Sequence, residues 1–211
     1  MSFFDLTLPV ENGMTYYPGD PEPRIAPVDQ EPPWMVSELR LGTHTGTHMD
    51  AARHRTPGAT PIDGYPVERF VVPGVVVALP GLSDDEPITW EMVEPGLARL
   101  PAGGAAVLFT GWDRHFRDER CLRHPYLAAD TARGLADAGA GIVGIDTMNP
   151  DSSVQGTTYV HETLLPRGVL LVENLTGLER LEPGRPYRFA FLPLRLTGLD
   201  GSPVRAIAWE E

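Results

Sequence analysis

Three histidines and an aspartate fall within eleven residues of the chain and could together hold a metal ion. They follow the spacing H-x3-H-x-D-x3-H and stand at His44, His48, Asp50 and His54. Imidazole nitrogens and carboxylate oxygens suit zinc, manganese and iron. The alternative is a polar turn held together by its own hydrogen bonds. Three histidines beside an aspartate favour metal binding, whereas a single buried histidine is more often a core residue.

The backbone between these residues decides which side chains can meet. Gly46 stands between two threonines, which argues against a helix in this segment. On a strand, residues i, i+4 and i+6 share one face. We therefore expect His44, His48 and Asp50 to point into one pocket from an extended segment, with His54 following past a bend.

Groups elsewhere in the chain could complete such a site. Glu173 follows an apolar run of strand length, where catalytic groups often project, but it could equally cap a turn or pair with an arginine. His161 could be a metal ligand or a residue on a helix surface. Tyr17 lies in an aromatic turn that could stack on a flat substrate or simply pack. His115 and His124 lie among charged residues, so we expect them to face solvent.

Composition excludes several classes of function. The 211 residues carry a formal net charge of -12, so the chain lacks the excess of positive charge by which proteins bind nucleic acid or an anionic membrane as a partner. All 17 basic residues are arginine, so a lysine Schiff base and a P-loop lysine are excluded. The single cysteine, Cys121, cannot form a disulfide within the chain. Because no signal peptide or spanning apolar run is evident, we expect a cytoplasmic protein.

Short runs of apolar residues predict the strands that would position these groups. Strands are predicted at 71–72, 75–79, 105–110, 141–145, 169–172 and 187–194. A Pro-Gly turn is expected between the first two. Continuous apolar runs are typical of strands buried on both faces, whereas the last run alternates like a half-buried strand.

Helical signals are fewer. Periodic apolar residues predict a helix over 127–138, and a shorter helix is expected over 158–165, each stopped by a glycine. Strand, helix and strand in that order between 105 and 145 predict a parallel crossover. The Pro-rich segment 18–33 should form an extended, ordered loop or arm. The chain is thus expected to be a β-rich α/β domain with few helices, with residues 1–211 forming a single domain.

Several motifs in this chain resemble those of the metal-dependent "cyclase" family, which includes bacterial kynurenine formamidases, isatin hydrolases and some polyketide cyclases. The cluster that begins at His44 is similar to the family signature H-x-G-T-H-x-D-x3-H. The other matching blocks are Tyr17–Asp20, Thr110–Trp112, Gly144–Asp151, His161–Leu175 and Asp200–Ala206. They extend the resemblance over nearly the whole chain.

The resemblance implies a fold and a role for each site residue. The fold would be a β-rich swivelling β/β/α domain. The implied metal ligands are His44, His48, Asp50, His161 and Glu173, the last two completing a second site. His54 falls on the catalytic histidine of the family. Tyr17 falls on an aromatic position that faces the substrate.

The implied activity is hydrolysis of an amide C–N bond by metal-activated water. The expected partner is a small-molecule substrate. It would be an aryl formamide, such as the N-formylkynurenine of tryptophan catabolism, or a cyclic amide. A metal-dependent cyclase or dehydratase of a polyketide-like substrate is the alternative, and a non-catalytic binding protein is a third possibility. One or two zinc or manganese ions per subunit and a homodimer or homotetramer are also implied. In the family, N-terminal segments lie near the active site of the neighbouring subunit. The resemblance therefore implies the same role for the 18–33 arm.

Overall fold

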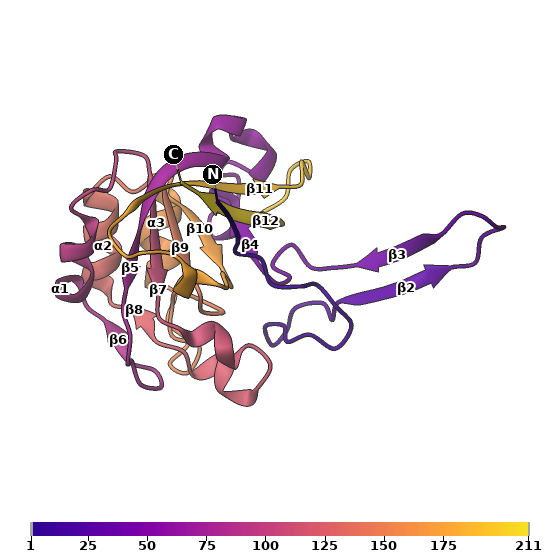
Figure 1. Cartoon of the computed structure of the whole chain (residues 1–211), viewed down its shortest axis with the longest axis horizontal. Coiled ribbons are helices and arrows are strands. Elements are labelled where there is room, and N and C mark those ends of the chain that lie inside the picture. Colours follow the sequence, from indigo (N-terminus) through magenta and orange to yellow (C-terminus); the bar gives the residue numbers. More distant parts are fainter. Residues whose placement is uncertain (1, 211) are drawn as a thin grey trace.

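The structure, a computed structural model that describes residues 2–210, is built around one large sheet (Figure 1). Its strands are β1 (Phe3–Asp5), β4 (His48–Asp50), β5 (Val71–Ala78), β7 (Ala105–Phe109), β9 (Ile142–Ile145), β10 (Leu170–Glu173), β11 (Pro186–Pro193) and β12 (Gly201–Trp209). They lie in the order β1-β12-β11-β5-β7-β9-β10-β4, and β4 also pairs with β12. Because β4 pairs with both β10 and β12, the strands from β12 to β4 close into a barrel. β1 lies outside this ring and pairs with β12 next to β4.

Both faces of this sheet are buried along β5, β7, β9 and β10. Residues on its inner face form one apolar core, and its outer face packs against the helices α1 (Trp90–Val93), α2 (Ala129–Asp137) and α3 (Tyr159–Leu164). In β5, Val72 and Val76 point into the barrel, while Val75 and Val77 point to the helices. The expectation of a β-rich α/β fold with few helices is confirmed.

The central strands and helices lie close to their expected positions. Strands β5, β7, β9 and β10 run parallel in that order, and α2 lies between β7 and β9 in the chain. The helix α2 ends before Gly139, and a single 3-10 turn after α3 ends at Gly168. Both glycines have positive φ, a backbone conformation that stops a helix. A small parallel pair, β6 (Pro87–Ile88) with β8 (Tyr126–Leu127), lies outside the barrel.

The turn expected at Pro73-Gly74 is wrong, because β5 runs straight through it. Pro73 pairs with Arg188 of β11, and Gly74 pairs with Ala105 of β7. A Cβ on Gly74 would lie 2.3 Å from the carbonyl oxygen of Ala105. Glycine therefore stands here because two backbones approach closely, and the chain does not turn.

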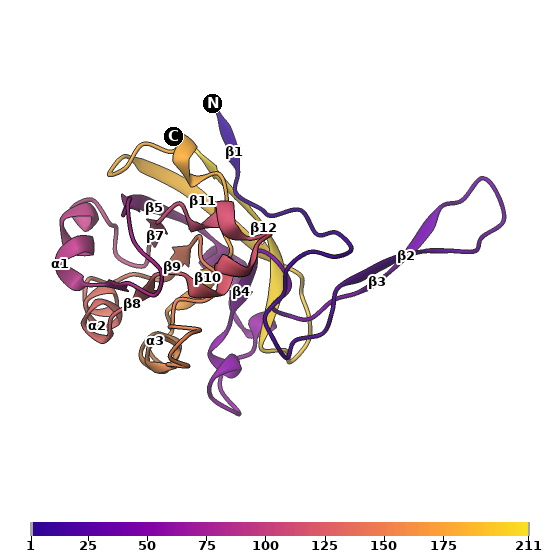
Figure 2. The ribbon, with the colours of Figure 1, turned by 90° about the horizontal axis from the view of Figure 1, so that it is seen from below.

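The Pro-rich segment leads into a hairpin that projects from the body. Strands β2 (Arg24–Val28) and β3 (Val36–Arg40) pair only with each other, and they reach far from the barrel in both views (Figure 1, Figure 2). Its tip carries Trp34 and Met35, whose exposed fractions are 73% and 97%. The extended segment expected at 18–33 is thus one side of a longer arm that spans residues 24–40.

Candidate functional site

The strand β4 presents two polar residues to one face of the closed sheet. Met49 belongs to the barrel core, so His48 and Asp50 on either side of it point to the opposite face, where α3 packs. Both are buried, at 3% and 1% exposure. In the antiparallel pairing of β4 with β10, Glu173 lies directly across from His48. The register therefore brings a second carboxylate to the same place.

The extended segment expected from His44 to Asp50 covers only β4. His44 precedes it in a tight turn in which Gly46 has φ +62, and a Cβ on Gly46 would lie 3.2 Å from Cε of Met14. The turn folds His44 back over the strand, so that His44 Nδ1 lies 2.8 Å from Asp50 Oδ1. The three side chains meet as expected, but through a turn at their first member.

Four contacts of 3.4 Å define the centre of the cluster. His48 Nε2 lies 3.4 Å from Asp50 Oδ1 and from Glu173 Oε2. His161 Nε2, on α3, lies 3.4 Å from Asp50 Oδ2 and from Glu173 Oε1. These separations exceed those of good hydrogen bonds. They match the roughly 3.4 Å between two ligand atoms that bind one tetrahedral ion at about 2.1 Å.

One buried oxygen in this centre has no hydrogen-bond partner among residues 2–210. It is Oδ2 of Asp50, and leaving such an atom unpaired inside a protein is costly. A cation between Asp50, Glu173 and the histidines would satisfy it. The donor set therefore fits a divalent metal ion.

The second nitrogen of each histidine has its own acceptor, which fixes the ring. The Nδ1 atom of His48 lies 2.8 Å from the carbonyl oxygen of Gly46, and that of His161 lies 2.7 Å from Asp151 Oδ2. The Nε2 atom of His44 lies 2.9 Å from Asp200 Oδ2. Acceptors of this kind orient metal-binding histidines and leave the other nitrogen free for the ion.

The carboxylates give the cluster a strong preference for positive charge. Burial alone would lower the pKa of His44, but the charge of Asp50 and the hydrogen bond to Asp200 outweigh it and raise that pKa to about 10. Burial is likewise outweighed by carboxylates at His48 and His161, whose pKa values are raised. Burial would raise the pKa of Asp50, yet the nearby histidines hold it well below its usual range. Protons and metal ions compete for such a site.

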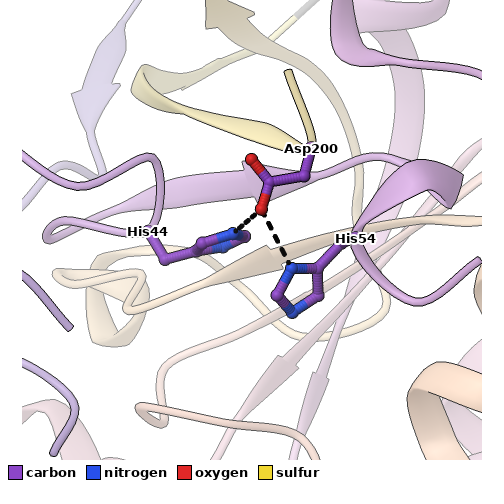
Figure 3. Close-up of side chains that lie close together, drawn as sticks. All are labelled: His44, His54 and Asp200. Carbon is purple, nitrogen blue, oxygen red and sulfur yellow. Dashed lines mark hydrogen bonds and ion pairs between the residues drawn. The ribbon is translucent and has the colours of Figure 1, made fainter. Parts of the chain in front are cut away.

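His54 lies at the open side of the cluster. It ends a 3-10 turn, Ala52–His54, directly after β4, and a third of its side chain is exposed. Its ring centroid lies 4.1 Å from that of His44 and 5.5 Å from that of His161. Its Nδ1 atom lies 3.4 Å from Asp200 Oδ2 (Figure 3). The bend expected between Asp50 and His54 thus places an imidazole beside the buried cluster and in reach of solvent.

All seven residues singled out from the sequence line one cavity of about 340 Å³. They are Tyr17, His44, His48, Asp50, His54, His161 and Glu173. Tyr16, Arg55, Asn149 and Thr158 also line it. The cavity therefore has an aromatic wall, an imidazole-carboxylate floor and one arginine.

Two aspartates of the site were not recognised from the sequence. Asp151 accepts hydrogen bonds from the backbone N–H groups of Val160 and His161, at 3.1 and 3.2 Å, as well as from the His161 ring. Asp200 stands 146 residues after His54 in the chain. Both lie within sequence blocks that match the family, and that was the only signal available.

The expectation that His124 faces solvent is wrong. It is 1% exposed, its Nδ1 atom lies 2.9 Å from the carbonyl oxygen of Pro125, and its Nε2 atom lies 2.8 Å from Ser153 Oγ. Burial lowers the pKa of His124. It is a core histidine whose ring nitrogens are satisfied by hydrogen bonds, apart from the candidate site.

Comparison with known proteins places this geometry in a family. The family described as "Putative cyclase" matches residues 4–152. The chain belongs to the cyclase family. Kynurenine formamidase of Paracidovorax citrulli is 33% identical over 97% of this chain and 94% of the relative. Kynurenine formamidase of Salinibacter ruber is 32% identical over 98% of this chain and 97% of the relative.

Solved structures share the fold of this cyclase-family chain. A structure titled a potential metal-dependent hydrolase with cyclase activity superposes with a TM-score of 0.84 at 26% identity, covering 100% of this chain and 99% of the other. Isatin hydrolase A from Ralstonia solanacearum gives a TM-score of 0.85 at 23% identity, over 98% and 91% of the two chains. Within residues 2–210, none of the helices combines the length and the apolar character that a membrane span requires.

Proposed function

We propose that this protein is a metal-dependent hydrolase that cleaves the amide C–N bond of an aryl formamide such as N-formylkynurenine. The observation that carries the proposal is the buried centre of 3.4 Å contacts with an exposed imidazole, His54, at its open side. The kynurenine formamidases among the relatives favour amide hydrolysis over the cyclase alternative. A cyclic amide is the second candidate substrate, because isatin hydrolases share the fold.

We assign two divalent ions, zinc or manganese, to the centre. The two oxygens of Asp50 face different histidines, Oδ1 towards His48 and Oδ2 towards His161, and Glu173 repeats this division. His44 and His48 would share the first ion with Asp50. His161 and Glu173 would hold the second, with Asp50 bridging the two. Imidazole suits zinc and carboxylates suit manganese, so the donor set admits both.

In this mechanism the residues of the chain hold the ions and move one proton. Divalent ions bound here would acidify a water molecule and polarise the substrate carbonyl oxygen. His54 accepts a proton from the attacking water, whose oxygen bonds to the formyl carbon. His54 then returns the proton to the departing nitrogen as the C–N bond breaks. The products are formic acid, which ionises to formate at neutral pH, and the free aromatic amine.

The cavity wall suits a flat substrate that carries a carboxylate. Tyr16 and Tyr17 both line the cavity, and its volume lies within the usual range for small-molecule sites. Arg55 also lines it and is paired with Glu162, which accepts a second hydrogen bond from Thr158 Oγ1 at 3.0 Å. We assign aromatic stacking to Tyr17. Arg55 would meet the substrate carboxylate.

The decisive experiment follows kynurenine release from N-formyl-L-kynurenine. Protein loaded with zinc or with manganese should turn the substrate over with kcat/KM above about 10⁴ M⁻¹s⁻¹, and a chelator should abolish the reaction. Asp137→Ala, which alters an exposed carboxylate paired with Arg167, serves as the control and should match the unaltered protein. Protein shown to hold metal that leaves N-formylkynurenine untouched would exclude this substrate and make isatin the next to test.

We also propose that residues 1–211 act as one catalytic domain in a homodimer or homotetramer. The arm supports assembly, because Trp34, Met35 and Leu39 are 73%, 97% and 61% exposed on a hairpin that projects from the barrel. Light scattering on the intact protein should give at least twice the 23.1 kDa of one chain. Replacing Trp34 and Met35 with serine should shift the assembly towards the monomer. A monomeric starting protein would refute the proposal.

A further inference from the structure

One carboxylate oxygen lies between two histidines of the site. The Oδ2 atom of Asp200 is 2.9 Å from His44 Nε2 and 3.4 Å from His54 Nδ1 (Figure 3). The three residues come from the turn before β4, the 3-10 turn after it, and the residue that precedes β12. A single oxygen thus contacts a proposed metal ligand and the proposed base.

The backbone holds Asp200 firmly at this point. The N–H group of Ala51 donates to the carbonyl oxygen of Asp200 at 2.9 Å, and the next residue, Gly201, pairs with Asp50. A Cβ on Gly201 would lie 2.7 Å from the carbonyl oxygen of Met49 and 3.0 Å from His44 Cε1. Glycine therefore allows β12 to approach β4 closely enough for the Asp200 carboxylate to reach both rings.

The hydrogen-bonding chemistry fixes which ring nitrogens carry protons. An ionised carboxylate only accepts hydrogen bonds, so His44 Nε2 donates to it at 2.9 Å, and His54 Nδ1 faces it as a donor in a longer contact of 3.4 Å. An aspartate carboxyl is ordinarily ionised at neutral pH, so Asp200 acts here as an acceptor. In a neutral ring the other nitrogen then carries the lone pair. That nitrogen is Nδ1 in His44, which faces Asp50, and Nε2 in His54.

We infer that Asp200 is a positioning residue that sets the tautomers of His44 and His54 together, so that one ring offers Nδ1 to a metal ion and the other offers Nε2 to the attacking water. The inference rests on the proposed function for the role of His54 as the base. It goes further because it attributes the orientation of both rings, the proposed ligand His44 and the proposed base His54, to the one carboxylate of Asp200. Loss of Asp200 should therefore weaken metal binding and proton transfer at once.

The direct test observes the tautomers and needs no substrate. The chain has six histidines, so long-range ¹H–¹⁵N spectra of histidine-labelled, zinc-loaded protein can be assigned by single substitutions. His54 should be protonated at Nδ1 in the unaltered protein and should shift to mixed or Nε2 protonation in Asp200→Ala. Asp200→Asn, which keeps the size and one acceptor oxygen, should show a smaller shift. An unchanged His54 tautomer in Asp200→Ala would overturn the inference.

Metal titration and kinetics supply the second test. Asp200→Ala should bind zinc about 10- to 100-fold more weakly, the usual effect of removing the partner of a ligating histidine. At saturating zinc its kcat should fall about 100-fold or more while KM changes little, because general-base transfer contributes about 10²–10⁴-fold. The Asp200 side chain is 38% exposed, so added acetate should enter and restore part of kcat. A rise in KM at constant kcat, or no response to acetate, would contradict a positioning role.

A matched control separates this role from a general loosening of β12. Asp5 of β1 accepts two hydrogen bonds from Arg205 in the middle of β12, so Asp5→Ala removes a carboxylate that contacts the same strand without touching the site. It should leave zinc affinity, tautomers and kcat unchanged. Loss of a whole equivalent of zinc in Asp200→Ala alone would identify His44, His54 and Asp200 as ligands of a separate ion and refute the inference. A tautomer shift in a protein inactive on N-formylkynurenine would uphold it and reject only the proposed substrate.

Discussion

Replacing Gly201 with alanine should disturb both the closure of the barrel and the chemistry of the site. The added Cβ would lie 2.7 Å from the carbonyl oxygen of Met49, whereas carbon and oxygen approach to only about 3.3 Å in ordinary contacts. The strand β12 must therefore move away from β4 by about 0.6 Å. The obstacle is backbone, and it cannot rotate aside.

The cost can be estimated from the hydrogen bonds that hold the two strands together. Ala51 donates to Asp200 at 2.9 Å, and Val204 donates to Thr47 at 3.0 Å. A shift of about 0.6 Å weakens both bonds, each worth about 1 kcal/mol, so Gly201→Ala should lose about 2 kcal/mol of unfolding free energy. The same shift withdraws Asp200 from His44 and His54. Displacements near 1 Å cost up to about 10²-fold in rate, so kcat should fall by at least about tenfold.

The assay combines urea unfolding with turnover at saturating metal. Arg205→Ala on the same strand is the control, since that side chain is exposed and remote from the site. It should leave both the unfolding midpoint and kcat unchanged. If Gly201→Ala matched the unaltered protein in both measurements, the close approach of β12 to β4 would not be what holds the site together.

Four further predictions concern the site residues. In chelated protein, the pKa of His44 is raised from 6.5 to about 10, so its stabilising contribution is complete below pH 6.5 and is lost as the pH rises towards 10. The free energy of unfolding should therefore fall between pH 7 and pH 9, by up to about 1.4 kcal/mol per pH unit for this group, and the urea midpoint should fall with it. Asp50→Ala should lose both ions, measured by elemental analysis after desalting. His54→Ala should keep its metal but lose about 10²–10⁴-fold in kcat. Arg55→Ala should raise KM for N-formylkynurenine severalfold at nearly constant kcat, whereas substrates without a carboxylate should be unaffected.

Each of these predictions has an outcome that contradicts it. A midpoint that rises with pH in chelated protein would mean that His44 is not held protonated by its carboxylate neighbours. Full metal content in Asp50→Ala would displace the proposed centre, and metal loss in His54→Ala would make His54 a ligand. Equal KM changes for substrates with and without a carboxylate would remove Arg55 from recognition.

Local patterns in the sequence were sufficient to predict the strands β5, β7, β9, β10 and β11 and the first candidate ligands. Alternation along a strand requires that His48 and Asp50 share a face, and the structure has both on the face opposite Met49. An apolar run before Glu173 was enough to place it at a strand end. These features depend on neighbours in the chain, which a single sequence displays directly.

Features that depend on distant partners were not predictable in this way. Asp200 joins the site only because β12 pairs with β4, a pairing between segments about 150 residues apart. The Pro73-Gly74 pair was expected to be a turn, because the close approach of β7 that requires a glycine is not visible in the local sequence. His124 lies among charged neighbours in the chain, yet tertiary packing buries it. In each case the deciding contact comes from a strand or loop far away in sequence.

The short strand β4 also has a kinetic consequence. Three residues join β10 to β12, and two of them are proposed metal ligands, so detachment of this short strand would withdraw both ligands together. Where detachment of β4 limits release, chelators should remove the metal at a rate independent of their concentration. The same opening should set the hydrogen-exchange rate of the Asp50 and Ala51 amides. The lifetime of the bound metal would then depend on how often the three-residue strand β4 detaches, and not on the equilibrium affinity of the site for the metal.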